Sequence, residues 1–183
     1  MKLLRIIFFL LLLCKNLPSV AQDTLFWKAA DTLTWNDFKG MPNRSARYLA
    51  ISATGITYTY RYTDAGLNFQ VRAFFVRSKS WRNYGTDLKV LKHEQGHFDI
   101  TEIYARKLAS QMQQLKPTKS NFRKSVEALG ESIINEKNKT QKQYDLETGS
   151  GTKRKMQRKW ETAIQQQLEG EPGCCKNEFY PGL

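Results

Sequence analysis

The sequence has 183 residues, and its 29 lysines and arginines against 17 aspartates and glutamates give a formal net charge of +12. A chain of this length without an internal repeat or a shift in composition is expected to form a single domain. The cysteines exclude a disulfide-stapled scaffold, because Cys14 lies in an apolar N-terminal run and Cys174 and Cys175 are neighbours, between which a bond is strained. A hydrophobic core must therefore hold the domain together.

The N-terminus has the pattern of a secretory signal peptide. Two basic residues precede the apolar run IIFFLLLLC, which is shorter than the about 20 residues that a membrane span requires. The small residues of the tripeptide SVA, which ends at Ala21, provide a cleavage site. We therefore expect a signal peptide over residues 1–21 and a domain over residues 22–183. The mature chain is expected to be secreted or periplasmic, without a transmembrane segment and with a net charge of 12 − 3 = +9.

The first half of the predicted domain is rich in strands. A short strand is expected at Leu33–Trp35, before a loop that contains glycine and proline. Large apolar or aromatic residues alternate with polar ones over Ile56–Tyr62, and the alternation resumes over residues 67–76. Gly66 can adopt a positive φ in the turn between them. These two segments are expected to form an antiparallel hairpin.

The second half is expected to be helical. Thr86 or Asp87 can cap a helix that runs to about Leu115, and a second helix runs from about Ser120 to Tyr144. The glycine-rich sequence YDLETGSG then interrupts the pattern before a third helix. Its apolar positions recur at helical spacing and should face the core: Met156, Trp160, Ile164 and Leu168. The fold class is therefore α+β, with N-terminal antiparallel strands packed on a C-terminal helical half.

The first of these helices carries both histidines of the chain, in the sequence HEQGH. A four-residue step on a helix turns about 40° and rises about 6 Å, so His93 and His97 project from one face and can bind one metal ion. Glu94 is offset by about 100°, too far to bind the metal but near enough to accept a proton from an attacking water. The H-E-x-x-H motif thus predicts Zn²⁺ ligands at His93 and His97 and a general base at Glu94.

The alternative is a helix with two ordinary histidines, because three fixed positions also occur by chance. Three features favour the metal site. Histidine is used nowhere else in the chain, an exported protein commonly meets zinc, and the pair borders an apolar helix stripe that includes Leu91, Phe98 and Ala105.

Zinc needs a third protein ligand, and catalysis needs an open fourth position. The nearby carboxylates of Asp99 and Glu102 lie about 160° and about 140° from His97 around a continuous helix, so both should face away. Glu102 can instead pair with Arg106, four residues later.

A third ligand from a later segment is more credible. The interruption between the second and third helices supplies the carboxylates of Asp145 and Glu147, and Tyr144 adds a hydroxyl that could stabilise an oxyanion. The sequence does not choose between the two carboxylates.

Four blocks of the sequence resemble one bacterial family. LTWNDFKGMP, SWRNYG, LKHEQGHFDITEIYAR and YDLETGSGTKRKMQRKW together resemble DUF922, whose members are described as predicted secreted zinc-dependent proteases of the zincin type. The resemblance implies the ligand and base roles of His93, His97 and Glu94. It also implies a zincin-like fold, in which a sheet packs on the active-site helix.

The chain departs from the pattern of that family at one position. The downstream block of the family ends with a His-Gly pair, a natural source of the third ligand, whereas this chain has Ser150 and Gly151. The neutral hydroxyl of serine is a poor zinc ligand. Either Glu147 or Asp145 completes a site of two histidines and one carboxylate, or the metal is held weakly and catalysis is lost.

The expected function is a secreted zinc-dependent metallopeptidase that hydrolyses a peptide or protein substrate. The alternative is a catalytically inactive, zincin-like binding protein of the envelope that lacks a complete zinc site. Such a protein could use its basic helices to contact anionic envelope surfaces. A third hypothesis, nucleic-acid binding, follows from charge alone, and export argues against it, so no specific nucleic acid is expected.

Overall fold

The computed structural model describes residues 23–64 and 66–170. The expected signal peptide and the adjacent cysteines Cys174 and Cys175 lie outside these residues. Within the described part of the chain, no helix has the length and apolar character that crossing a membrane requires.

Five strands and two short 3₁₀ helices precede three long α-helices. The strands are β1 (Thr24–Phe26), β2 (Ala50–Ile51), β3 (Thr54–Thr63), β4 (Gly66–Val76) and β5 (Trp81–Arg82). The 3₁₀ helices are η1 (Trp35–Asp37) and η2 (Arg77–Lys79). The α-helices are α3 (Leu88–Gln114), α4 (Phe122–Thr148) and α5 (Arg154–Gly170). Antiparallel strands in the first half and helices in the second half confirm the predicted α+β class.

The predicted hairpin is the central feature of the sheet. Strands β3 and β4 pair antiparallel from Thr54↔Phe75 to Thr63↔Gly66, and β1 adds to the other edge of β4. Gly66 has a φ of 114°, the positive value that its place in the turn was expected to need. Strands β2 and β5 form a separate antiparallel pair beyond the hairpin.

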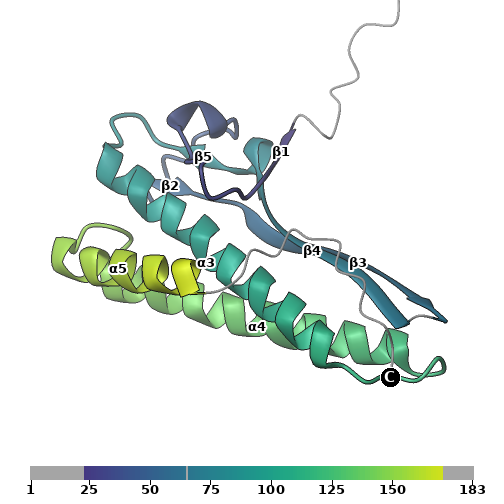
Figure 1. The fold of residues 1–183 in the computed structure, drawn as a ribbon. Helices are drawn as coiled ribbons and strands as arrows, with labels where there is room; N and C mark the ends of the chain where they lie inside the picture. The colour runs from purple at the N-terminus through teal and green to yellow at the C-terminus, as the bar shows by residue number, and fades with distance from the viewer. Residues whose placement is uncertain (1–22, 65, 171–183) are drawn as a thin grey trace, which may run out of the picture.

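Helix α3 occupies the middle of the molecule. It packs against the β3–β4 hairpin on one side and against α4 and α5 on the other (Figure 1). The core between the hairpin, α3 and α4 is built mainly from Phe69, Val71, Phe75, Phe98, Leu108, Met112, Val126 and Ile133. A smaller cluster joins the three helices through Ile100, Tyr144 and Ile164, with Trp160 and Leu168 packed against it. This packing confirms the predicted inward face of α5 at Trp160, Ile164 and Leu168.

The strand predicted at Leu33–Trp35 is wrong. Residues 35–37 form η1, in which Thr34 and Asp37 make a reciprocal capping box. The carboxylate of Asp37 accepts hydrogen bonds from the backbone N–H and the hydroxyl of Thr34. These local bonds satisfy backbone groups that a strand would have offered to a neighbour.

Helix α4 is longer than predicted. It runs to Thr148, and Gly149, Ser150 and Gly151 then adopt positive φ angles of 57°, 51° and 84°. The backbone N–H groups of Gly149 and Ser150 both donate to the carbonyl oxygen of Asp145, which closes the helix. Asp145 therefore lies in the last turn of a helix, whereas the sequence suggested a loop.

Gly96 lets α3 and α4 approach closely beneath the histidines. A Cβ placed on Gly96 would lie 2.8 Å from Cζ of Tyr144, whose side chain is fully buried. We expect Gly96→Ala to lower the free energy of unfolding by about 1–3 kcal/mol through overpacking, although alanine favours helices. Urea unfolding measures the change. Gly170→Ala is the control, since none of the described residues lies within 4 Å of its added methyl group. An unchanged unfolding midpoint for Gly96→Ala would contradict the expectation.

Candidate metal centre

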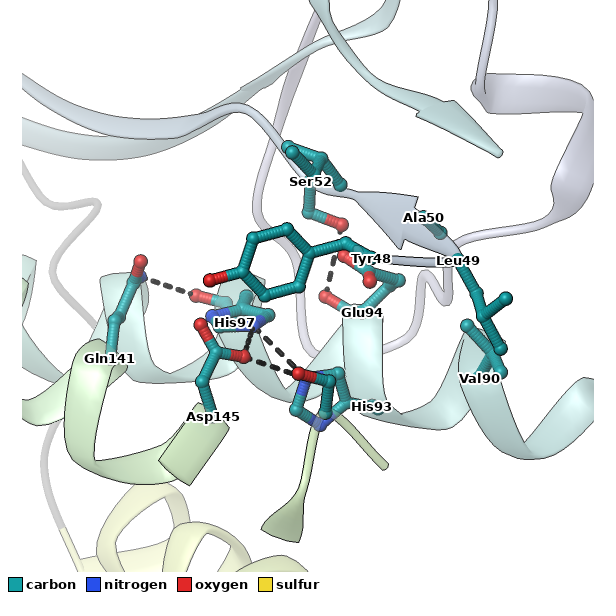
Figure 2. A pocket seen from close by; sticks show the side chains of 12 residues that line it. Tyr48, Leu49, Ala50, Ser52, Val90, His93, Glu94, His97, Gln141 and Asp145 are labelled. Atoms are coloured by element: carbon teal, nitrogen blue, oxygen red, sulfur yellow. Dashed lines mark hydrogen bonds and ion pairs between the residues drawn. The ribbon is translucent and has the colours of Figure 1, made fainter. Parts of the chain in front are cut away.

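Three predicted ligands converge at one point between α3 and α4. His93 and His97 project from α3, and Asp145 projects toward them from α4 (Figure 2). Oδ1 of Asp145 lies 3.0 Å from Nε2 of His93 and 3.1 Å from Nε2 of His97. The two Nε2 atoms are 3.2 Å apart. Three potential ligand atoms thus form a nearly equilateral triangle.

This triangle has the size of one face of a zinc coordination tetrahedron. Zinc–nitrogen and zinc–oxygen bonds of about 2.0–2.1 Å place tetrahedral ligands about 3.3 Å apart. The observed separations of 3.0–3.2 Å come within a few tenths of an ångström of that spacing. Two imidazoles and one carboxylate are also a donor set that zinc accepts, and they leave the fourth position open. The residues present therefore fit a catalytic type of zinc site.

The ring of His93 is held in the orientation that a ligand needs. Its Nδ1 lies 3.1 Å from Oε1 of Gln157 on α5. The amide nitrogen of Gln157 donates to the carboxylate of Glu161, which can only accept, so the amide oxygen must face the histidine. When Nε2 binds a metal, the proton of His93 therefore lies on Nδ1, and the lone pair on Nε2 points at the centre of the triangle.

Tyr144 lies behind the metal site. Its ring stacks on His93 with centroids 4.5 Å apart, and its hydroxyl donates to the carbonyl oxygen of His93 and accepts from Gln157. Burial raises the pKa of this hydroxyl, so it stays protonated at neutral pH. The structure thus places the hydroxyl of Tyr144, which was predicted to stabilise an oxyanion, outside the cavity lining, where it supports His93.

The carboxyl group of Asp145 is ionised in this setting. Burial acts to raise its pKa, but hydrogen bonds and charge from His93 and His97 outweigh burial and hold the pKa well below its usual range. At neutral pH the group is therefore a carboxylate, the form that a metal ligand requires.

Glu94 has an oxygen that the fold leaves unpaired. Its side chain is only 3% exposed, and its Oε2 is buried without a hydrogen-bond partner among the residues that the structure describes. A buried carboxylate oxygen without a partner is costly unless a ligand or water completes it. Glu94 lines a cavity of about 220 Å³ together with both histidines and Asp145. Oε2 of Glu94 therefore needs a water or a ligand group from this cavity to complete its hydrogen bonding.

Glu147, the other carboxylate proposed from the sequence, is not part of the convergent set. Its carboxylate accepts hydrogen bonds from Nε1 of Trp160 at 2.8 Å and from the side chain of Gln143 at 2.7 Å. Asp145 and Glu147 are two positions apart, about 200° around the helix, so only one of them can face the histidines.

Sequence reasoning missed two residues of the site. Tyr48 lines the cavity from the segment before β2, and its ring extends over the side where His97 and Gln141 lie (Figure 2). Gln157 supports His93 from a third helix. Tyr48 lies outside the sequence blocks that resemble the family, and Gln157 lies within one of them but not at a position of the helical apolar pattern, so neither was identified as a site residue.

The two acidic residues expected to face away from the histidines have other partners. Glu102 pairs with Arg106 at 2.9 Å, which confirms the predicted four-residue pair. Asp99 accepts hydrogen bonds from Nε1 of Trp27 and from the side chain of Gln95, both at 2.8 Å. Asp99 therefore attaches the N-terminal segment to α3.

Asp99 should make stability depend on pH. Burial raises its pKa, although the hydrogen bonds from Trp27 and Gln95 act in the opposite direction. A raised pKa means that ionisation of Asp99 is disfavoured in the folded state, which lowers the free energy of unfolding at neutral pH. This loss of stability becomes smaller as the pH falls through the folded pKa and is absent below the unfolded pKa. We expect Asp99→Asn to be more stable than the parent at pH 7 and equally stable near pH 4, as measured by urea unfolding. The exposed Asp64→Asn is the control, and a gain independent of pH would contradict the argument.

Comparison with known protein families identifies the family of this chain. The sequence model of a family described as "Bacterial protein of unknown function (DUF922)" matches residues 32–154, which include the three convergent ligands and Glu94. No curated protein and no solved structure matches the chain.

Proposed function

Because the chain belongs to the DUF922 family of bacterial proteins, whose description assigns no function, we propose a function from the site itself: an exported, zinc-dependent metallopeptidase with a zincin-like arrangement of sheet and active-site helix. The observation that carries the proposal is the convergence of His93, His97 and Asp145 beside the unpaired carboxylate oxygen of Glu94. Two histidines, one carboxylate and a neighbouring base are the parts that metal-assisted hydrolysis requires.

His93, His97 and Asp145 would hold Zn²⁺ beside the cavity that they line. When bound there, zinc would supply Lewis acidity toward a substrate carbonyl and make a water molecule more acidic. Gln157 and Tyr144 would keep His93 in its ligand orientation, as their hydrogen bonds support. The chain thus supplies both the ligands and the groups that fix them.

Glu94 would act as the general base. Its unpaired Oε2 would accept a proton from the water that attacks the peptide carbonyl, and Glu94 would return that proton to the amine as the C–N bond breaks. One proton would pass from the water to the leaving amine, so Glu94 would be a carboxylate again at the end of each cycle.

A peptide is the substrate that the cavity walls favour. Residues 48–52 line the cavity, and among the described strands β2 pairs only with β5. The opposite edge of β2 therefore presents backbone groups with which an extended peptide could pair. This arrangement would lay the substrate backbone alongside the three ligands.

Tyr48 is the best placed group to stabilise the oxyanion. Its phenol can donate a hydrogen bond into the cavity, and no described residue accepts one from it. We expect Tyr48→Phe to lower kcat about a hundredfold, because one oxyanion donor is lost, while zinc content stays the same. Steady-state kinetics on a cleavable peptide measure this. Tyr62→Phe, on the hairpin, is the control, and an unchanged kcat for Tyr48→Phe would remove Tyr48 from the proposal.

The decisive experiment combines zinc analysis with hydrolysis. The purified mature chain should contain about one zinc per molecule, cleave an unstructured protein such as casein, and lose activity on chelation until zinc is restored. Zinc binding without any cleavage would favour the rival function, an envelope binding protein. A chain that fails to bind zinc after metal-replete purification would refute the metallopeptidase.

A further inference from the structure

A second cavity adjoins the metal cavity. Its volume is about 350 Å³, and it shares two wall residues, Leu49 and Val90, with the metal cavity. The rest of its lining comes from residues 84–87, the first turn of α3, and residues 151, 152 and 154. An extended chain advances about 3.3 Å per residue. Two adjoining cavities can therefore hold neighbouring parts of one peptide.

The charges at this second cavity do not cancel. Asp87, its acidic lining residue, is already engaged, because it accepts hydrogen bonds from the backbone N–H groups of Lys89 and Val90 and pairs with Nζ of Lys89 at 3.4 Å. Asp87 and Lys89 thus neutralise each other.

Arg154 is the lining residue whose positive charge is not neutralised by a described carboxylate. It is exposed at the start of α5, and no carboxylate pairs with it in the part of the chain that the structure describes. Nearby, the guanidinium of Arg44 lies 5.7 Å from the ring centroid of Tyr84, a cavity residue that is 84% exposed. The cavity therefore offers an apolar surface beside an unneutralised positive charge.

We propose that this second cavity binds a carboxylate of the peptide substrate, and that Arg154 determines this specificity. The inference rests on the proposed peptidase function. The guanidinium of arginine is planar and presents paired N–H donors that match the two oxygens of a carboxylate. The carboxylate belongs to an acidic side chain near the scissile bond or to the free C-terminus of the peptide.

Binding to an inactive variant tests the inference without turnover. Zinc-loaded Glu94→Gln is titrated into fluorescently labelled hexapeptide amides that carry a single Glu at each position in turn, and into matched peptides with Gln. We expect at least one Glu peptide to bind about tenfold more tightly than its Gln partner, the effect of one exposed charge-assisted contact. A matching peptide that ends in a free carboxylate at the same position distinguishes the two sources.

A second substitution identifies the cation. Adding Arg154→Gln to the inactive variant should abolish the preference, whereas Arg158→Gln, one turn further along α5 and outside the cavity lining, should keep it. Equal binding of Glu and Gln peptides, no binding at millimolar peptide, or a preference that survives Arg154→Gln would overturn the inference. Failure of the peptidase is seen separately, as absence of cleavage by the parent chain.

Discussion

Replacement of Asp145 by alanine is expected to weaken zinc binding at least about a hundredfold, because it removes one of three protein ligands. In the structure, Oδ1 of Asp145 is within 3.1 Å of both histidine Nε2 atoms, so no other described carboxylate can take its place without movement of the helix. Competition with a chromogenic chelator measures the affinity, and elemental analysis gives the stoichiometry.

Glu147→Ala is the matched control for that experiment. It removes a carboxylate from the same end of α4. That carboxylate accepts hydrogen bonds from Trp160 and Gln143 and does not face the histidines. We expect its zinc affinity to equal that of the parent. Loss of zinc in Glu147→Ala with retention in Asp145→Ala would mean that the end of α4 is rotated in the working protein.

The largest expected effect on activity comes from Glu94→Gln. The amide has nearly the same size as the carboxylate but cannot accept the proton, so kcat should fall by about 10²–10⁴-fold. Zinc affinity should change little, because Glu94 is not among the convergent ligands. Parallel measurement of hydrolysis and zinc content separates the two roles.

The exposed Glu131→Gln, on α4, controls for the general effect of removing one negative charge. Activity unchanged in Glu94→Gln would exclude Glu94 as the base. Loss of zinc in Glu94→Gln would instead make Glu94 part of the metal site.

The elements with a strong local pattern could be predicted from the sequence. Alternation over residues 56–62 and 67–76 identified the β3–β4 hairpin, because the period of a strand is fixed by its own backbone. The spacing of His93 and His97 likewise placed two potential ligands on one helix face.

The third ligand depended on information that no local pattern contains. Asp145 faces the histidines because α4 continues past Tyr144 and packs on α3 in one rotational setting, which Gly96 and Tyr144 fix by contact. The cluster of glycines suggested a loop beginning at Tyr144, although the positive φ angles begin only at Gly149. The position of Tyr48 at the cavity could not be predicted for a similar reason, since only tertiary contacts bring its segment there.

The placement of the ligands has a consequence for the topology of the chain. His93 and Asp145 are 52 residues apart in sequence and come from different helices. A metal ion bound by both would close a loop across α3 and α4, and closing a loop of that length in the unfolded chain corresponds to about 4 kcal/mol of lost conformational entropy. The ion would then act as a disulfide bond does in many exported proteins, so that one site would serve both hydrolysis and the stability of the packed helices.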